Sequence, residues 1–324
     1  MNKPLYSSPY LLFSDGIGDC FFNLPAMRAL SEFFEGRLTL ICTKGIADLF
    51  FRDLSLRRII EIPNVVVPDN RKEAVEICKR EITSCDLFIY INPYFFTELL
   101  DLIDYLDTET MGYFEPFKIQ VPMDQEKHSL ISHFNFSLYF NNQLNLTEYS
   151  YPPTYKFSDG DIAKRIIDSI PPDNKLLIVH PDTTKEFKTW AYPNYNTLFD
   201  MILDRYPLYI IMLVGNSVLN TENCLYKDRI FSAADLPLEI NLDLIKHAGV
   251  FIGIDSCFLH AADFFRIPSV GIFANEYSSR RYGLALTQHH HVFSETTDIN
   301  LVAPIDVYNA FSSLVEVQNT VPIN

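Results

Sequence analysis

Asp19 is the residue of this chain best suited to acid–base chemistry. It ends the polar stretch Gly16-Ile17-Gly18-Asp19, which follows an apolar run and precedes a helical pattern. A carboxylate there can accept a proton from a substrate hydroxyl, and a nearby helix N-terminus favours its ionised form. Asp also commonly caps helices, and the sequence leaves these two roles open. Asp15 is a weaker candidate base and is more typical of a turn.

Gly16 and Gly18 allow the backbone to turn tightly and to approach a ligand closely. As a dinucleotide-binding fingerprint the match is poor. The third glycine would fall at Phe21, and no acidic residue ends the second expected strand near Cys42. The stretch therefore favours a ligand other than NAD.

A second polar stretch follows an apolar run in the other half of the chain. It contains Thr183, Thr184 and Lys188. Two hydroxyls and an ammonium suit a diphosphate, and a fixed cation stabilises the charge that a leaving diphosphate gains. The alternative is a solvated loop with incidental lysines. Trp190, the single tryptophan, is expected to pack at the base of this loop rather than to stack on a ligand.

A third stretch, Asp255-Ser256 followed by His260, comes after another apolar run. Asp255 and Ser256 can cap the next helix while the backbone amides face a phosphate. His260 is expected about one turn into that helix, where a histidine is more often packed than catalytic.

The sequence gives little support for a metal site. Adjacent side chains diverge, so His289, His290 and His291 are expected to form a solvated loop rather than one ligand set. There is no Asp-x-Asp motif of the kind that holds a diphosphate through a cation. We therefore expect no metal and no cofactor, with protein groups neutralising the diphosphate.

Composition narrows the possible partners and the compartment. The chain has 324 residues and a net charge of −15, which argues against a nucleic-acid partner because phosphates need clustered Lys and Arg. No apolar run approaches the roughly 20 residues of a spanning helix, and the N-terminus does not resemble a secretory signal. Six cysteines lack CxxC spacing and suggest reduced thiols. These features predict a cytoplasmic protein without a membrane span.

Apolar runs alternate with helical patterns in both halves of the chain. Runs at residues 10–13, 38–42, 59–62 and 87–91, and again at 176–179, 208–214, 250–254 and 269–273, predict buried parallel strands. Residues 111–150 have no clear pattern, and the paired prolines 152 and 153 predict a linker. The expected fold is α/β, with two doubly wound Rossmann-like domains, residues 1–152 and 153–324, facing across a cleft.

Three short sequence segments together resemble the bacterial heptosyltransferases of glycosyltransferase family nine, which have the GT-B fold. The first is Gly18-Asp19 with Leu24-Pro25-Ala26, and the second runs from His180-Pro181 to Lys188-Thr189-Trp190. The third is Asp255-Ser256 through His260-Ala261-Ala262, followed by Pro268-Ser269-Val270-Gly271-Ile272-Phe273. Their order and separations fit that family across most of the chain.

The resemblance implies an inverting, metal-independent transfer of a sugar, with a heptose as one candidate, from a nucleoside-diphosphate donor to a carbohydrate or glycoconjugate hydroxyl. Asp19 would be the general base in an acceptor-side first domain. In the second domain, Thr183, Thr184 and Lys188 would hold the donor diphosphate. Asp255, Ser256 and His260 would shape the donor side of the cleft. A final helix, expected at residues 305–315, would pack back toward the first domain.

The chain also departs from that family. Cys257 stands where a glycine is common in the family. The acidic residue that contacts the donor ribose in family members has no clear counterpart after Gly215, and Glu222 is the candidate for it. Two alternatives to a glycosyltransferase therefore stay open on the same fold. One is a nucleotide-sugar epimerase or hydrolase, and the other is a non-catalytic sugar-nucleotide-binding protein.

Overall fold

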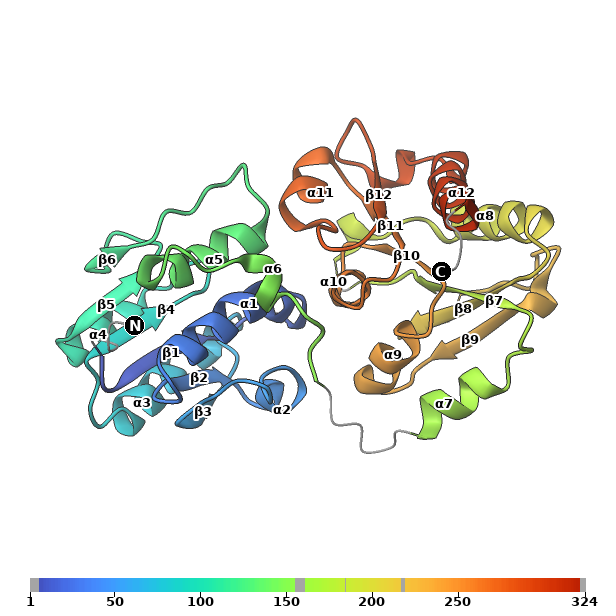
Figure 1. Ribbon diagram of the computed structural model, residues 1–324. Coiled ribbons are helices and arrows are strands. Elements are labelled where there is room, and N and C mark those ends of the chain that lie inside the picture. The colour runs from blue at the N-terminus through green and yellow to red at the C-terminus, as the bar shows by residue number, and fades with distance from the viewer. Residues whose placement is uncertain (1–5, 155–160, 184, 217–218, 321–324) are drawn as a thin grey trace. The chain divides into compact units, whose positions relative to one another are not determined.

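The computed structural model describes residues 6–154, 161–183, 185–216 and 219–320. Its contacts divide the chain into two compact units, Met1–Lys156 (unit 1) and Phe157–Asn324 (unit 2). Within the described residues, each unit contains a six-stranded sheet with helices on both faces (Figure 1). No described helix has both the length and the apolar character needed to cross a lipid bilayer.

Unit 1 is built on an entirely parallel sheet with strand order β3-β2-β1-β4-β5-β6. The strands are β1 (Pro9–Phe13), β2 (Thr39–Thr43), β3 (Arg58–Ile62), β4 (Leu87–Tyr90), β5 (Glu109–Gly112) and β6 (Ile119–Gln120). The α-helices are α1 (Ile17–Phe33), α2 (Ile46–Phe50), α3 (Arg71–Glu81), α4 (Glu98–Leu106), α5 (Ser129–Phe140) and α6 (Leu146–Tyr149). The strand order reverses between β1 and β4, where doubly wound sheets bind their ligands.

Alternating side chains of the unit 1 strands pack on opposite faces of the sheet, as the pleat requires. Tyr10 and Leu12 of β1 belong to a buried cluster with Ala74 of α3 and Leu99 of α4, so these helices cover that face. Helix α1 packs against α5 and α6 (Figure 1). Burial on both faces explains why these strands read as continuous apolar runs.

Unit 2 repeats this topology with strand order β12-β11-β10-β7-β8-β9, again all parallel. The strands are β7 (Lys175–His180), β8 (Tyr209–Gly215), β9 (Ile230–Ala234), β10 (Val250–Ile254), β11 (Ser269–Phe273) and β12 (His289–Phe293). The α-helices are α7 (Asp161–Asp168), α8 (Tyr192–Arg205), α9 (Leu238–Ile245), α10 (Cys257–Phe264), α11 (Glu276–Tyr282) and α12 (Pro304–Thr320). Here the order reverses between β7 and β10.

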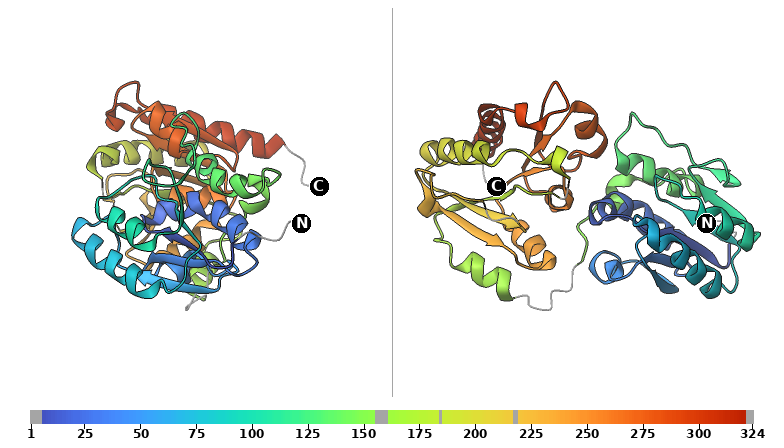
Figure 2. Two further views of the ribbon diagram at one scale, coloured as in Figure 1. Left: turned by 90° about the vertical axis from the view of Figure 1, so that its left-hand side faces the viewer. Right: turned by 180° about the vertical axis from the view of Figure 1, so that it is seen from behind.

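Helices α8 and α12 lie side by side over one face of the unit 2 sheet, as Figure 2 shows from behind. Val307 and Phe311 of α12 enter the same buried cluster as Phe199 of α8 and Ile252 of β10. Trp190 is fully buried in this cluster and donates its indole N–H to the carbonyl of Val302 at 3.0 Å, which confirms its packing role. The packing of the last helix toward the first domain stays a prediction.

The prediction of an α/β protein with two doubly wound Rossmann-like domains is confirmed. Helix α1 begins at Ile17, and Pro25 lies inside it. An internal proline removes a backbone donor and costs about 3 kcal/mol. Residues 20–31 are all buried, and this packing outweighs the cost of the proline.

The prediction for the His tract was wrong. His289, His290 and His291 form the start of β12 and pair with β11, instead of forming a solvated loop. His289 and His291 lie on the same side of the strand with their ring centroids 4.6 Å apart, and the ring of His291 contacts Phe273 at 5.2 Å. The tract is therefore part of an edge strand of the unit 2 sheet, and its three imidazole rings are half-buried.

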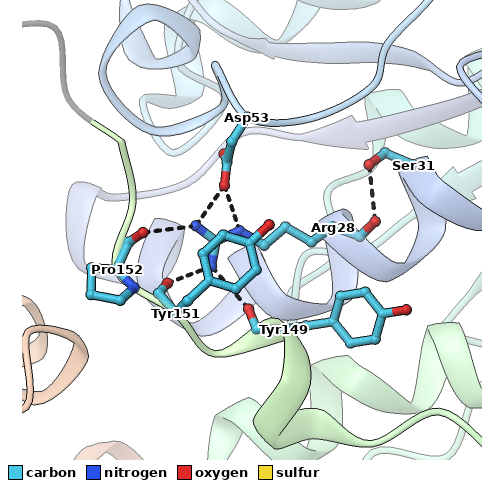
Figure 3. A network of polar contacts seen from close by, with 6 residues as sticks. All are labelled: Arg28, Ser31, Asp53, Tyr149, Tyr151 and Pro152. Atoms are coloured by element: carbon cyan, nitrogen blue, oxygen red, sulfur yellow. Dashed lines mark hydrogen bonds and ion pairs between the residues drawn. The ribbon is translucent and has the colours of Figure 1, made fainter.

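A buried ionic network fixes the end of unit 1 (Figure 3). Arg28 of α1 donates from Nε to Oδ2 of Asp53 at 2.8 Å, and from Nη1 to the carbonyls of Tyr149 and Tyr151 at 2.9 and 2.5 Å. Its Nη2 donates to the carbonyl of Pro152 at 3.3 Å, and its guanidinium lies over the ring of Tyr151. Arg28 therefore joins α1 to the segment that contains the prolines predicted as a linker.

Candidate functional site

Gly16, Gly18 and Asp19 all lie just beyond the carboxyl end of β1, at the reversal of strand order in unit 1. Gly16 is the N-cap residue of α1, and Asp19 is the third residue of the helix. Asp19 is therefore not the N-cap, which was its alternative role. A Cβ on Gly16 would lie 3.1 Å from Oδ2 of Asp19, so the glycine makes room for this carboxylate.

A second carboxyl group lies beside Asp19. The side chains of Asp15 and Asp19 are hydrogen-bonded to each other, and Oδ1 of Asp15 accepts the N–H of Gly16 at 2.8 Å. Burial raises the pKa of Asp15 to about 6, although both hydrogen bonds act in the opposite direction. The sequence suggested a turn residue here, whereas the structure places a buried partner for Asp19.

The loop after β4 supplies the other wall of this region. Asn92 donates to the carbonyl of Ser14 at 2.6 Å and accepts the N–H of Ser14 at 3.2 Å, and the Tyr94 hydroxyl donates to the same carbonyl. Burial, followed by the charge of Asp15, raises the pKa of Tyr94 above its ordinary value. The phenol is therefore neutral at physiological pH. Sequence reasoning missed Asn92 and Tyr94, although both follow a predicted strand that neighbours β1.

In unit 2 the structure brings together three of the predicted donor-side residues. Nζ of Lys188 lies 2.6 Å from Oδ2 of Asp255, and Nε2 of His260 lies 3.7 Å from Oδ1 of the same carboxyl group. Burial raises the pKa of Asp255, and the ammonium of Lys188 partly offsets that effect. A cation and a buried carboxyl group thus meet where the strand order reverses between β7 and β10.

Ser256 joins this group through residues that sequence reasoning left without a role. Its Oγ lies 3.0 Å from Nδ1 of His180, the last residue of β7. Nε2 of His180 lies 2.8 Å from Oδ1 of Asp182, and Oδ2 of Asp182 accepts the N–H of Asn216 at 2.9 Å. His180 and Asp182 flank Pro181, and their position directly after a strand was the signal available in the sequence.

The remaining predicted residues are less connected. Thr183 is half-buried and its hydroxyl accepts the N–H of Lys185 at 3.3 Å, while Thr184 lies outside the described residues. Burial raises the pKa of the Cys257 thiol to about 12, so this thiol carries no charge at neutral pH. Glu222 is exposed and pairs with Lys227 at 2.9 Å, with no arrangement that marks it as a ribose ligand within the described part of the chain.

The chain is similar in fold to several solved glycosyltransferase structures. A glycosyl transferase family 9 protein from Veillonella parvula DSM 2008 aligns with a TM-score of 0.77 at 13% identity, over 96% of this chain and 98% of that chain. Escherichia coli ADP-heptose lps heptosyltransferase II aligns with a TM-score of 0.68 at 13% identity, over 97% of this chain and 100% of that chain. E. coli heptosyltransferase WaaC with ADP aligns with a TM-score of 0.66 at 13% identity, over 95% of this chain and 99% of that chain. By sequence, no curated protein matches.

The family model for glycosyltransferase family 9 (heptosyltransferase) matches residues 107–300, which is more than half of the chain. The matched region contains Lys188, Asp255, Ser256 and His260 and ends after β12, whereas Asp19 lies before it. Together with the two-domain fold, this match supports the GT-B assignment. The chain belongs to glycosyltransferase family 9, the heptosyltransferase family, and is a glycosyltransferase.

Proposed function

We propose that this protein is an inverting glycosyltransferase that moves a sugar from a nucleoside-diphosphate donor to a hydroxyl of a carbohydrate or glycoconjugate, without a metal ion. Unit 2 binds the donor and unit 1 binds the acceptor. The observation that carries the proposal is the meeting of Lys188, Asp255 and His260 at the carboxyl edge of the unit 2 sheet.

The donor diphosphate is proposed to bind beside Lys188, with the hydroxyls of Thr183 and Thr184. When the glycosidic bond breaks, the diphosphate gains negative charge, and a fixed ammonium stabilises that charge without reorganising in the transition state. The contact with Asp255 holds Nζ of Lys188 in place before the donor arrives. His260 and Asp255 form the wall of the same site, because their side chains meet at 3.7 Å.

Asp19 is proposed as the general base that takes the proton from the acceptor hydroxyl. Its position in the first turn of α1 exposes the carboxylate to the positive end of the helix, which favours ionisation. Asp15 shares a hydrogen bond with it and is the more deeply buried of the two. The pair therefore provides one carboxyl group that retains a proton more readily and one that is available to accept a proton.

ADP-heptose is the first donor to test, because two of the similar structures are E. coli heptosyltransferases whose descriptions name ADP or ADP-heptose. The protein would be incubated with ADP-heptose or with GDP-, UDP- and dTDP-sugars, and with a panel of saccharide acceptors. The anomeric configuration of the product, read from its proton coupling constant by NMR, tests inversion. Retained configuration, or release of free sugar or of an isomer without acceptor, would overturn the proposal.

A further inference from the structure

The buried serine before Asp15 fixes the end of β1. The N–H of Ser14 donates to Oδ1 of Asn92 at 3.2 Å, and its carbonyl accepts from Nδ2 of Asn92 at 2.6 Å. Its hydroxyl lies 2.7 Å from that of Thr43, at the end of β2, and accepts the N–H of Val65, beyond β3, at 3.2 Å. Each hydrogen-bonding group of Ser14 thus has a partner on a neighbouring strand or loop, so the backbone that carries Asp15 is held in place.

The carboxyl group of Asp15 is itself held on two sides. Its Oδ1 accepts the N–H of Gly16 at 2.8 Å, and its side chain is hydrogen-bonded to that of Asp19. Asp15 is buried, whereas Asp19 is half-buried. An ionised carboxylate only accepts hydrogen bonds, so a hydrogen bond between two carboxyl groups needs a proton on one of them. The pair therefore carries a proton between its two side chains.

The titratable groups around the pair do not compensate a second negative charge. Tyr90, at the end of β4, and Tyr94, in the loop after it, both interact with the charge of Asp15. Burial, with a further contribution from that charge, raises the pKa of both phenols, so they are neutral. Arg71 of α3 acts on both phenols, but among the described residues no cation is paired with Asp15. Full ionisation of Asp15 and Asp19 would therefore place two carboxylates side by side.

We propose that Asp15 is a positioning residue for the base of this reaction: it shares a single proton with Asp19, and this proton holds the Asp19 carboxyl group with its other oxygen free for the acceptor hydroxyl. The inference rests on the proposed role of Asp19 as the general base. In the transfer step the acceptor oxygen bonds to the anomeric carbon, the bond from that carbon to the diphosphate oxygen breaks, and the acceptor proton goes to Asp19. The shared proton then lies on Asp15, and the pair releases one proton to solvent before the next turnover.

Sharing a proton restricts transfer to the pH range in which the pair carries one. With two protons Asp19 cannot act as a base, and with none the two carboxylates repel each other and Asp19 loses its orientation. Burial raises the pKa of Asp15 to about 6, so the pair becomes fully ionised at or above this pH. On the alkaline side kcat/KM should then fall about tenfold for each pH unit.

Asp15→Asn separates the shared proton from the contacts of the side chain. The asparagine carbonyl can accept the N–H of Gly16, and its amide can donate to Asp19 at every pH. Between pH 8 and pH 9, kcat/KM should therefore change less than about twofold in this variant, and should fall about tenfold in the natural sequence. Asp86→Asn is the matched control, since Asp86 also accepts backbone N–H groups, at the other end of β1, and it should keep the tenfold fall.

Asp15→Ala removes the donor altogether. At pH 7 its kcat should lie about tenfold below that of Asp15→Asn, with the KM for the donor changed less than about twofold, because only the orientation of the base is lost. The higher kcat of the asparagine variant would show that a hydrogen-bond donor is needed at this position. Packing alone would not produce this division between kcat and KM.

The pair can also be observed without substrate. In protein labelled with 13C at the aspartate carboxyl carbons, the NMR signal of Asp15 is identified by its absence in Asp15→Asn. It should titrate in two steps in the natural sequence and in one step in Asp19→Asn, because coupled groups report each other's proton.

The possible failures are distinguishable. A single step in both proteins, a kcat/KM of the natural sequence that does not fall between pH 8 and pH 9, or a fall that persists in Asp15→Asn would overturn the positioning role. If no donor and acceptor are turned over, the proposed function fails. The titration still decides in that case whether Asp15 and Asp19 share a proton, because it needs no ligand.

Discussion

Lys188 places its Nζ 2.6 Å from Oδ2 of Asp255, although the two residues lie on different loops of the unit 2 sheet. The Lys188 side chain is 28% exposed, while that of Asp255 is 8% exposed. The ammonium thus contacts a buried carboxyl group on one side, while the Lys188 side chain remains partly exposed to solvent. Such a cation is positioned before a ligand arrives, which is the condition under which a fixed charge contributes most to catalysis.

Replacing Lys188 by methionine should lower kcat/KM by about 100-fold or more, since the charge that develops on the leaving diphosphate loses its fixed cation. Steady-state kinetics with a saturating acceptor measures this. Lys188→Arg keeps the charge but replaces the compact ammonium by a planar group. Its kcat/KM should lie between those of the natural enzyme and of Lys188→Met. A Lys188→Met enzyme with normal kcat/KM would remove Lys188 from the donor site.

Asp19→Asn should lower kcat by about 100-fold or more, because the carboxamide cannot accept the acceptor proton, whereas nucleotide affinity should change less than twofold. Turnover and calorimetric binding of ADP are compared in the same preparation. Asp15→Asn is the matched control, because it alters the neighbouring carboxyl group and leaves the proposed base in place. Near-normal turnover of Asp19→Asn would show that another group is the base.

The buried Asp15 carboxyl group predicts a pH-dependent stability. Its folded-state pKa is raised to about 6, from an ordinary value of 3.8, so the folded protein binds more protons than the unfolded chain between these values. The contribution of Asp15 to stability is therefore present below pH 3.8 and is lost as pH rises through about 6.

Asp15→Asn removes that loss. Relative to the natural sequence, the free energy of unfolding of this variant should rise between pH 4 and pH 7, by up to about 3 kcal/mol at 1.36 kcal/mol for each pKa unit. Urea unfolding at several pH values measures the difference. A constant difference across this range would show that Asp15 does not titrate in the folded protein as described.

The Arg28 network predicts a stability effect that an exposed ion pair does not share. Asp53→Ala leaves the buried guanidinium without its carboxylate, and should cost about 3 kcal/mol in the free energy of unfolding. Asp48→Ala removes the exposed partner of Arg52, with which it pairs at 3.0 Å, and should cost less than about 0.5 kcal/mol. Chemical denaturation compares the two, and equal costs would contradict the stabilising role of the buried pair.

Metal independence predicts that transfer continues in the presence of excess EDTA. Lys188 is proposed to supply the positive charge at the diphosphate that a divalent cation would otherwise provide. The rate after chelation and dialysis should stay within about twofold of the untreated rate. Full loss of activity, restored by added Mg²⁺ or Mn²⁺, would contradict this part of the proposal.

Strand-forming runs were predictable because both faces of each parallel sheet are covered, which makes β1, β10 and the central residues of β7 and β11 apolar. Placing the candidate residues needed only the rule that ligands bind at the carboxyl ends of such strands. Residues 111–150 were harder to interpret. Helix α5 there buries Ser132, His133 and Ser137 together with its apolar residues, so it has no clear hydrophobic periodicity.

The contacts between side chains could not be predicted from the sequence. His180 and Ser256 meet only because β7 and β10 are neighbours, and 76 positions separate the two residues in the chain. The pairing of Asp15 with Asp19 depends on the start of α1 at Ile17. That start is hard to predict from the sequence, because Pro25 usually marks the first turn of a helix and here lies inside it. In both cases the residue types were visible, whereas their partners depended on tertiary packing.

The tight fit around Gly215 has a practical consequence for altering the sugar preference of this enzyme. Random mutagenesis at the carboxyl end of β8 should recover few active clones at position 215, because a Cβ there would lie 2.3 Å from Oδ1 of Asp182 and 2.8 Å from Cδ2 of His180. Asn216 is a better position to vary, since its side chain is exposed and its backbone N–H, which any residue other than proline retains, donates to Oδ2 of Asp182. Libraries that fix the glycine and diversify its successor should retain more active variants.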